Sequence, residues 1–170
     1  MDRNEKVWYA CYGSNLNAER FRYYIEGGDC PYNGRNYPGC ADQTLWTDSR
    51  TRTFAGELYF GNESRTWDGK GVAFFDPEAN GTVIMRLYLI TRGQLLDVQD
   101  QEGLSGDWYG WLVPLGEADA IPVYTFTSES RRPANPPSEA YLAVIREGLV
   151  EGCGLSEAEA DAYLSAAIGN

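Results

Sequence analysis

Apolar and polar positions along the chain group into short runs, and six of these runs predict β-strands. The first run, residues 6–12, is rich in aromatic and β-favouring side chains and is typical of a buried strand. The other five strand patterns lie at residues 53–60, 71–76, 82–90, 107–114 and 121–127. Proline, asparagine and glycine between residues 76 and 82 indicate a hairpin that joins two of these strands.

Four further segments carry the apolar spacing of helices. The predicted helices are residues 17–25, 91–100, 138–150 and 157–167. Gly27-Gly28 follows the first of them and is expected to end it. Ser138 is a competent N-cap for the third, and Ser156 with Glu159 has the spacing of a capping box for the fourth.

The order of these elements favours the α+β class, because the strands do not alternate strictly with helices. We predict a small mixed or antiparallel β-sheet that curls into a barrel with surrounding helices. All of residues 1–170 are expected to form one domain, with the C-terminal helices of residues 138–168 packing on it. Residues 29–49 are polar and rich in glycine and proline, which predicts a long loop or insertion.

Charge and hydropathy exclude several kinds of partner. The 170 residues include 14 basic and 25 acidic side chains, so the net charge is −11 at pH 7. Such a charge repels phosphate backbones and anionic lipids, and we predict binding to neither nucleic acid nor membrane. The first six residues are too charged for a signal peptide, and no apolar stretch is long enough to cross a bilayer. These features predict a cytoplasmic protein.

The inventory of reactive side chains is also restrictive. The chain has four cysteines without CxxC-type spacing and no histidine, which predicts no metal site. The lack of histidine excludes Ser-His-Asp and Cys-His mechanisms. Any catalysis must therefore use another base.

The Tyr-Gly-Ser-Asn-Leu stretch at residues 12–16 joins the first predicted strand to the first predicted helix. Backbone N–H groups at such a junction lack an intrahelical partner and can receive an oxygen atom that carries negative charge. Gly13 permits a tight bend and the close approach of a ligand. Ser14, Asn15 and Asn17 are also competent N-caps, so the residues alone leave open an ordinary strand-to-helix turn.

Glu102 follows the second predicted helix, near Asp97 and Asp100. The C-terminal end of a helix is negative, so each partly exposed acid there is disfavoured by on the order of 0.3–1 kcal/mol. The same surroundings are expected to raise the pKa of a buried Glu102 and to make it a better base near neutral pH. Aromatic residues from Trp108 to Trp111 could supply apolar walls. A solvated acidic turn is the alternative interpretation.

Together these motifs resemble the γ-glutamylcyclotransferase-like family. The resemblance rests on segments in the family's order and at compatible spacing: Tyr12-Gly13-Ser14-Asn15-Leu16, Trp67 to Ala73, Gln101-Glu102-Gly103 and Pro136 to Tyr141. These segments cover roughly residues 7–150. The resemblance implies a compact mixed barrel with surrounding helices, which agrees with the independent count of strands.

The resemblance also implies a reaction without a cofactor or metal. Such an enzyme, of transferase or lyase type, cleaves the amide of a γ-glutamyl conjugate and releases 5-oxoproline and an amine or amino acid. Glu102 would act as the general base that takes a proton from the substrate's α-ammonium group. The freed amine would then attack the γ-carbonyl of the same γ-glutamyl unit. The residues implied to bind this small molecule are Tyr12, Gly13, Ser14, Asn15, Leu16, Trp108 and Tyr141.

The chain departs from the family's pattern in two places. Residues 29–49 are not part of it, and Trp108 stands where a tyrosine is expected, with Tyr109 one residue later. We predict that the 29–49 segment borders the pocket and helps to select the leaving amine, with Tyr32, Asn33, Asn36 and Tyr37 suited to contact a small polar ligand. A passive surface connector is the alternative.

Two other interpretations assign the chain to different functional classes. A non-catalytic module of the same fold, which binds a small ligand or another protein, would have kept the pocket but has no use for a raised-pKa Glu102. A metal-dependent deacetylase is rejected because the chain contains no histidine ligand.

Overall fold

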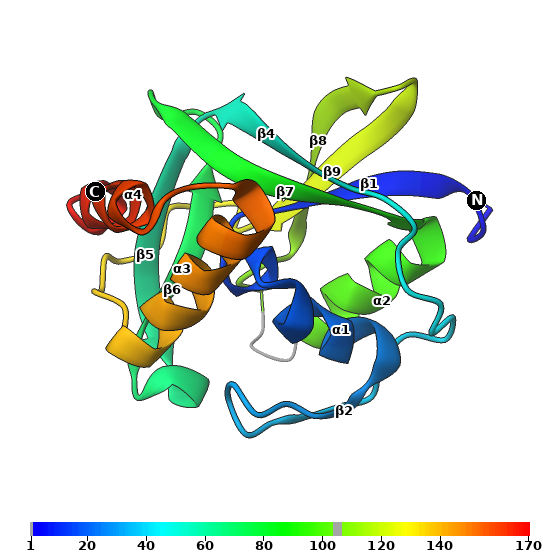
Figure 1. Cartoon of the computed structure of the whole chain (residues 1–170), viewed down its shortest axis with the longest axis horizontal. Coiled ribbons are helices and arrows are strands. Elements are labelled where there is room, and N and C mark those ends of the chain that lie inside the picture. The colour runs from blue at the N-terminus through cyan, green and yellow to red at the C-terminus, as the bar shows by residue number, and fades with distance from the viewer. Residues whose placement is uncertain (1, 104–106) are drawn as a thin grey trace.

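The computed structural model describes residues 2–103 and 107–170, with a five-stranded mixed sheet at its centre (Figure 1). In spatial order its strands are β4 (Ser49–Ala55), β7 (Thr82–Thr91), β1 (Lys6–Cys11), β9 (Ile121–Thr127) and β8 (Trp111–Ala118). Neighbouring strands are antiparallel except for β1 and β9, which pair in parallel. The first predicted strand is thereby confirmed as a central, buried strand.

A second sheet contains only β5 (Glu57–Ser64) and β6 (Lys70–Asp76). The strand predicted at 53–60 is therefore wrong in its extent, because the chain bends between β4 and β5. The bend lies at Gly56, whose φ is +140° and whose N–H donates to the Gly81 carbonyl at 3.1 Å. A side chain at this position would collide with the ring of Phe75, so only glycine fits the corner.

The hairpin predicted at residues 76–82 is also wrong. The strands on either side of that turn do not pair, since β6 pairs with β5 and β7 pairs with β4 and β1. The turn carries the chain from one sheet to the other, and local turn chemistry does not reveal this. Within the described residues β4 and β8 are the edges of the central sheet, so its recorded pairing does not close a barrel.

The four predicted helices are confirmed, and their bounds are α1 (Ala18–Glu26), α2 (Arg92–Glu102), α3 (Glu139–Cys153) and α4 (Glu157–Ile168). The predicted caps form as well: Ser138 accepts from the N–H of Tyr141, and Ser156 with Glu159 makes a complete capping box. The described elements also include the short 3₁₀ helices η1 (Ser14–Leu16) and η2 (Arg65–Trp67). In the described part of the chain, none of the helices is long and apolar enough to cross a membrane.

The helices hold the site against the sheets. Figure 1 shows α1, α2 and α3 side by side below the central sheet, with α4 beside β5. Helix α3 packs on η1, and α2 packs on β1 and β7. The core between these layers is rich in aromatic rings, including Phe21 stacked on Tyr88 at 4.5 Å between centroids. Helix α4 packs on β5, whereas α3 packs mainly on η1 in the loop after β1.

The strand predicted at 107–114 begins later than expected, at Trp111. Residues 107–110 form a turn instead, in which the Gly110 N–H donates to the Asp107 carbonyl at 3.4 Å. The 29–49 segment contains a two-residue hairpin, β2 (Gly28–Asp29) with β3 (Asn36–Tyr37). Both differences place additional irregular backbone next to the C-terminal end of α2.

Candidate functional site

A pocket opens where the loop after β1, the end of α2, the start of α3 and the 29–49 segment meet. It encloses about 680 Å³ of empty space, including its open mouth. Gly13, Ser14 and Asn15 line it, as does the carboxylate-bearing Glu102. Two motifs that lie 87 residues apart in the chain therefore face one cavity.

The glycine loop enters this cavity directly from strand β1. The φ of Gly13 is −116°, so a left-handed conformation does not explain the glycine. Close packing does: a Cβ at this position would lie 3.0 Å from the Cβ of Ala73 and 3.2 Å from the hydroxyl of Tyr141. The close approach of β6 and α3 to the loop is thus a reason for glycine at this position that the sequence did not indicate.

The end of the motif serves a different purpose. Leu16 is fully buried, lies outside the pocket lining and donates its N–H to the Gly13 carbonyl at 3.0 Å. Asn17 is the N-cap of α1, and its side chain accepts from the N–H of Arg20. The carbonyl of Asn15 accepts from the Tyr88 hydroxyl at 2.7 Å. These contacts fix the loop to the core and leave its first residues to face the pocket.

Glu102 is joined to the loop by a hydrogen bond. The side-chain amide of Asn15 donates to Glu102 Oε1 at 3.3 Å and to the Tyr9 hydroxyl at 3.1 Å. Glu102 lies in the last turn of α2 and is half-buried. Burial raises its pKa above the ordinary glutamate value of 4.5, while Arg20 and Tyr24 oppose that rise.

The predicted direction of this pKa shift is confirmed, but its predicted cause is not. Asp97 is not among the main causes of the shift in the pKa of Glu102, and its carboxylate accepts from Arg3 at 2.8 Å and from the N–H of Ala41 at 3.0 Å. Removal from water by the surrounding protein is the main cause. A carboxylate with a raised pKa is a stronger proton acceptor, which suits a general base.

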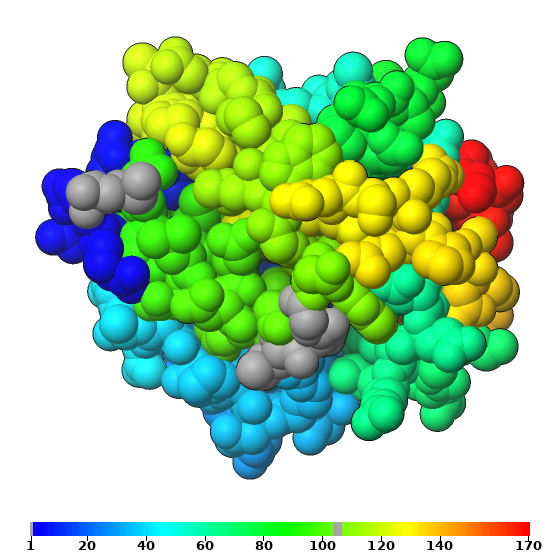
Figure 2. All heavy atoms as spheres, turned by 180° about the vertical axis from the view of Figure 1, so that it is seen from behind, coloured from blue at the N-terminus to red at the C-terminus, as the bar shows by residue number. Residues whose placement is uncertain are grey.

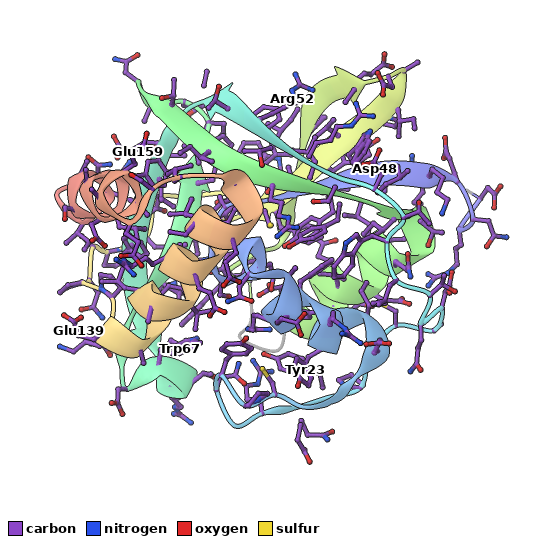
Figure 3. All side chains as sticks on the ribbon, in the orientation of Figure 1. Tyr23, Asp48, Arg52, Trp67, Glu139 and Glu159 are labelled. Atoms are coloured by element: carbon purple, nitrogen blue, oxygen red, sulfur yellow. The ribbon has the colours of Figure 1, made fainter. Side chains whose placement is uncertain are left out.

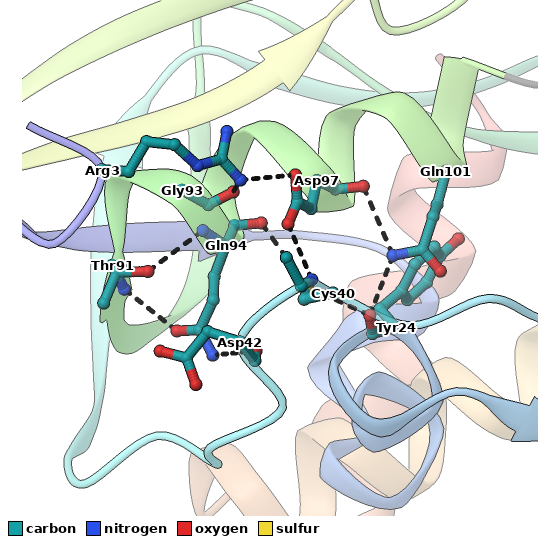
Figure 4. Close-up of polar contacts among 10 residues, drawn as sticks. Arg3, Tyr24, Cys40, Asp42, Thr91, Gly93, Gln94, Asp97 and Gln101 are labelled. Carbon is teal, nitrogen blue, oxygen red and sulfur yellow. Dashed lines mark hydrogen bonds and ion pairs between the residues drawn. The ribbon is translucent and has the colours of Figure 1, made fainter. Parts of the chain in front are cut away.

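Helix α2 is anchored so that its last turn reaches the pocket (Figure 4). At the first turn, Gln94 completes a capping box with Thr91 and also donates to the carbonyls of Asp42 and Thr44, at 2.9 and 2.8 Å. At the last turn, Gln101 donates to the Tyr24 carbonyl at 2.8 Å. The second half of the 29–49 segment and helix α1 together hold the helix that carries Glu102.

Because the pKa of Glu102 is raised, we predict that the difference in stability between the original chain and Glu102→Gln changes with pH. A folded-state pKa above the unfolded value means that the charged carboxylate is disfavoured in the fold, so stability is lost as pH rises from about 4 through the raised pKa. Glutamine does not titrate. The Tm of Glu102→Gln is therefore expected to rise relative to the original chain between about pH 4 and about pH 8, measured by thermal unfolding.

A control with the opposite sign is available on the surface. The pKa of Glu159 is lowered by hydrogen bonds with Ser156, so its charged form stabilises the fold and that stability is lost as pH falls. Relative to the original chain, Glu159→Gln should lose Tm as pH rises from about 3 to about 5, and the difference should stay constant from there to about pH 8. A Glu102→Gln difference that stays constant or runs in the Glu159 direction would contradict the raised pKa of Glu102.

Aromatic side chains form the other wall of the pocket. The hydroxyl of Tyr141 accepts from the Ala73 N–H at 3.0 Å, and the ring packs against Trp67 at 5.0 Å between centroids. Figure 3 shows Trp67 near the first turn of α3, close to Glu139. Tyr109 donates to the Ala73 carbonyl at 2.8 Å. Both hydroxyls therefore hydrogen-bond to the β6 backbone at Ala73, in the wall of the pocket.

The remaining residues predicted from the sequence also line the pocket. Trp108 packs near Phe74, with centroids 6.3 Å apart, and Tyr12 donates its hydroxyl to the Phe126 carbonyl at 2.6 Å. Tyr109, one residue after the position where the family pattern has tyrosine, reaches the wall as well. Residues 105 and 106, which precede this stretch, lie outside the described residues.

The pocket offers poor side-chain nucleophiles. Cys11 lines it, but burial raises the pKa of the thiol well above its usual value, and its Sγ donates to the Arg86 carbonyl at 3.4 Å. Ser14 also lines it, but the chain has no histidine to activate a hydroxyl. Over residues 2–103 and 107–170, no group of three or more His, Cys, Asp or Glu side chains is placed to hold a metal ion.

Two positively charged residues in the lining were not predicted from the sequence, Arg20 and Arg35. Arg20 could have been identified from the sequence, because it shares a helix face with Phe21 and Tyr24, where a charged residue is unexpected. Arg35 had no signal beyond the polar character of its segment, whereas Asn33 was one of the suggested ligand contacts and does line the pocket. Arg20 lies on α1, and Asn33 and Arg35 lie in the loop between β2 and β3.

The prediction that the 29–49 segment borders the pocket is confirmed by Asn33 and Arg35. Its role in choosing an amine stays a prediction. Tyr37, which the sequence suggested as a ligand contact, is instead 2% exposed and accepts from Asn33 at 2.9 Å. Figure 2 shows the segment, in light blue, along the edge of the molecule next to the green atoms around α2.

Comparison with known proteins gives one sequence relative. No protein-family model matches the chain. Histone deacetylase 5 of Arabidopsis thaliana is 35% identical to it over 202 aligned residues, which include 95% of this chain. The chain spans only 31% of the length of that protein.

Comparison with solved structures identifies the fold. A γ-glutamyl cyclotransferase superposes with a TM-score of 0.67 at 21% identity, covering 94% of this chain and 88% of that one. An uncharacterised protein from Homo sapiens gives a TM-score of 0.66 at 22% identity over the same shares of both chains. YkqA from Bacillus subtilis gives 0.64 at 17% identity, covering 97% of this chain and 55% of that one. The chain has the γ-glutamyl cyclotransferase-like fold.

Proposed function

We propose that this chain is a γ-glutamyl cyclotransferase-type enzyme that releases 5-oxoproline and an amine from a γ-glutamyl conjugate. The observation that carries the proposal is the meeting of Glu102 and the glycine loop in one pocket, joined by the Asn15 hydrogen bond to Glu102 at 3.3 Å. The γ-glutamyl cyclotransferase-like fold supports the same reaction class.

The reaction needs no side-chain nucleophile, which suits this pocket. Glu102 takes a proton from the substrate's α-ammonium group, and the freed nitrogen attacks the γ-carbonyl carbon. The bond from that carbon to the leaving nitrogen then breaks as the carbonyl re-forms. The ammonium gives up two protons in total while the lactam nitrogen keeps one, and the departing amide nitrogen gains both and leaves as an ammonium. Glu102 relays protons between the two nitrogens and ends unchanged.

The loop supplies the second requirement, which is to stabilise the oxygen of the tetrahedral intermediate. We assign this role to backbone N–H groups of Gly13, Ser14 and Asn15, because these residues face the pocket. Leu16 is left out of this set because its N–H already donates to the Gly13 carbonyl. Ring closure is intramolecular, so a pocket that holds the folded-back substrate supplies much of the rate enhancement.

The activity in the name of the Arabidopsis relative is not extended to this chain. A metal-dependent deacetylase needs side chains that bind its metal, and this chain has no histidine for that purpose. The aligned region is less than a third of that protein. We propose that the region shared by the two proteins is a cyclotransferase-like unit.

Mass spectrometry tests the proposed reaction. The full chain is incubated with γ-glutamyl amino acids, γ-glutamyl amines and glutathione, and 5-oxoproline is measured over time. We expect at least one compound to yield 5-oxoproline and the free amine in equal amounts. Binding of these compounds without any 5-oxoproline would contradict the enzyme and favour the ligand-binding module of the same fold.

A further inference from the structure

Arg20 is a buried cation that is close enough to Glu102 for the two charges to interact, but in the described part of the chain it makes no hydrogen bond or ion pair with that carboxylate. Its side chain is 3% exposed, lies on the inner face of α1 and lines the pocket. One guanidinium nitrogen donates to two tyrosine hydroxyls, Tyr37 at 2.9 Å and Tyr24 at 3.4 Å. The guanidinium also lies over both rings, at 5.1 and 4.7 Å from their centroids.

The other two nitrogens of this guanidinium are unsatisfied. Arg20 Nε and Nη1 are buried and have no hydrogen-bond partner among residues 2–103 and 107–170. Within the same described residues, Arg20 forms no ion pair with any carboxylate. Leaving a buried charge unpaired is costly, and buried arginines normally bind a carboxylate or phosphate through two parallel N–H donors. The two unsatisfied N–H groups of Arg20 are therefore free to bind an anion from outside the chain, in addition to the electrostatic influence of Glu102.

Neighbouring residues reinforce the positive charge on this side of the pocket. Arg35 also lines the pocket, and its guanidinium stacks on the Tyr37 ring at 5.0 Å. Asn33 donates to the Tyr37 hydroxyl at 2.9 Å and so helps to hold the tyrosine under both arginines. A chain with a net charge of −11 thus gathers two guanidinium groups around a pocket that contains the Glu102 carboxylate.

We propose that Arg20, assisted by Arg35, is a carboxylate subsite that holds the α-carboxylate of the γ-glutamyl unit. The inference rests on the proposed function and adds the group that recognises the substrate's amino-acid end. In a γ-glutamyl unit the α-ammonium and the α-carboxylate are attached to one carbon. A base that reaches the ammonium must therefore have the carboxylate's binding group close by, and Arg20 and Glu102 share Tyr24 as a neighbour.

The subsite would also orient the reaction. With the carboxylate fixed by the planar fork of Arg20, the α-ammonium is directed toward Glu102 and the γ-carbonyl toward the glycine loop. A carboxylate on the leaving amino acid could supply the same chemistry, but it lies at the far end of the substrate from the ammonium that Glu102 must reach. The experiment separates these two sources.

Calorimetry on the full chain measures the preference for a carboxylate directly. The ligands are 5-oxoproline, which retains the α-carboxylate, and 5-oxoprolinamide, in which a neutral amide replaces it. We expect the original chain to bind 5-oxoproline at least about tenfold more tightly, as for a charge-assisted bidentate pair. Arg20→Gln should bring the ratio of the two Kd values close to one. Arg35→Gln should reduce it by a smaller factor.

Matched variants control for charge and for position. Arg22→Gln removes an exposed arginine of the same helix that pairs with Glu26, and it should leave the ratio unchanged. Arg20→Lys keeps the charge without the planar fork and should give an intermediate ratio. If circular dichroism shows that Arg20→Gln does not fold, the test uses Arg20→Lys and Arg35→Gln instead. A ratio of the two Kd values that is unchanged in both of these variants overturns the subsite.

Other outcomes are equally decisive. Equal binding of the two ligands by the original chain, or binding of neither, overturns the subsite. The original chain is also compared on γ-glutamylglycine and γ-glutamylglycinamide, which differ only in the carboxylate of the leaving group. If Arg20→Gln abolishes a KM preference for γ-glutamylglycine but keeps the preference for 5-oxoproline, Arg20 binds the carboxylate of the leaving group. That result also overturns the proposed subsite. Failure of every γ-glutamyl compound to yield 5-oxoproline would reject the proposed function separately, since the calorimetric ratio does not depend on turnover.

Discussion

Glu102→Gln is expected to lower the release of 5-oxoproline by on the order of a hundredfold or more, the usual consequence of removing a general base. Glutamine keeps the size of the side chain and can still bond to Asn15, so binding of 5-oxoproline should change little. The loss should therefore fall on kcat rather than on KM. Initial rates by mass spectrometry, with the Kd of 5-oxoproline measured alongside, check both statements.

Asp100→Asn is the matched control for that variant. Asp100 is an exposed acid two residues earlier on the same helix, and it does not line the pocket. Its replacement removes the same charge from α2 and should leave kcat within about twofold, as for a solvated surface charge. If Glu102→Gln retains near-original rates on a compound that the chain turns over, Glu102 is not the base.

Gly148→Ala is expected to destabilise the fold and to reduce activity together. A Cβ at this position of α3 would lie 2.5 Å from the backbone nitrogen of Asn17 and from the carbonyl carbon of Leu16, so helix and loop must separate. Overpacking of this kind costs about 1–3 kcal/mol. Alanine recovers about 0.8–1 kcal/mol of helix propensity over glycine, which is too little to offset the upper part of that range. Chemical denaturation measures the net loss.

The activity of the folded fraction is the more specific measurement. Because Gly148 contacts the end of the loop that carries Gly13, Ser14 and Asn15, a shift of that loop should lower kcat even where the variant remains folded. Glu151→Ala, an exposed change on the same helix, should alter neither stability nor rate appreciably. A Gly148→Ala chain with greater stability and the original rate would show that α3 does not position the loop.

Local chemistry explains why some elements could be predicted. The side chains of Ser138 and Ser156 accept hydrogen bonds from backbone N–H groups only three residues away, so their caps depend on neighbouring sequence alone. The apolar run of β1 likewise indicates a strand that is buried on both faces. The two sheets were not predictable in this way. The corner at Gly56 exists because the backbone there bonds to Gly81 and lies against Phe75, both distant in sequence.

The same distinction between local and long-range interactions applies to the candidate site. The sequence by itself determined the α+β class, the four helices, the absence of histidine chemistry and the two motifs that carry Glu102 and the glycine loop, because each depends on residue types and short-range spacing. Only the tertiary structure decided that these motifs share a pocket with Arg20, that Leu16 is part of the core, and that burial raises the pKa of Glu102. The burial of a side chain and the presence of an unsatisfied hydrogen-bond donor depend on contacts between segments that are distant in sequence, so no local pattern predicts them.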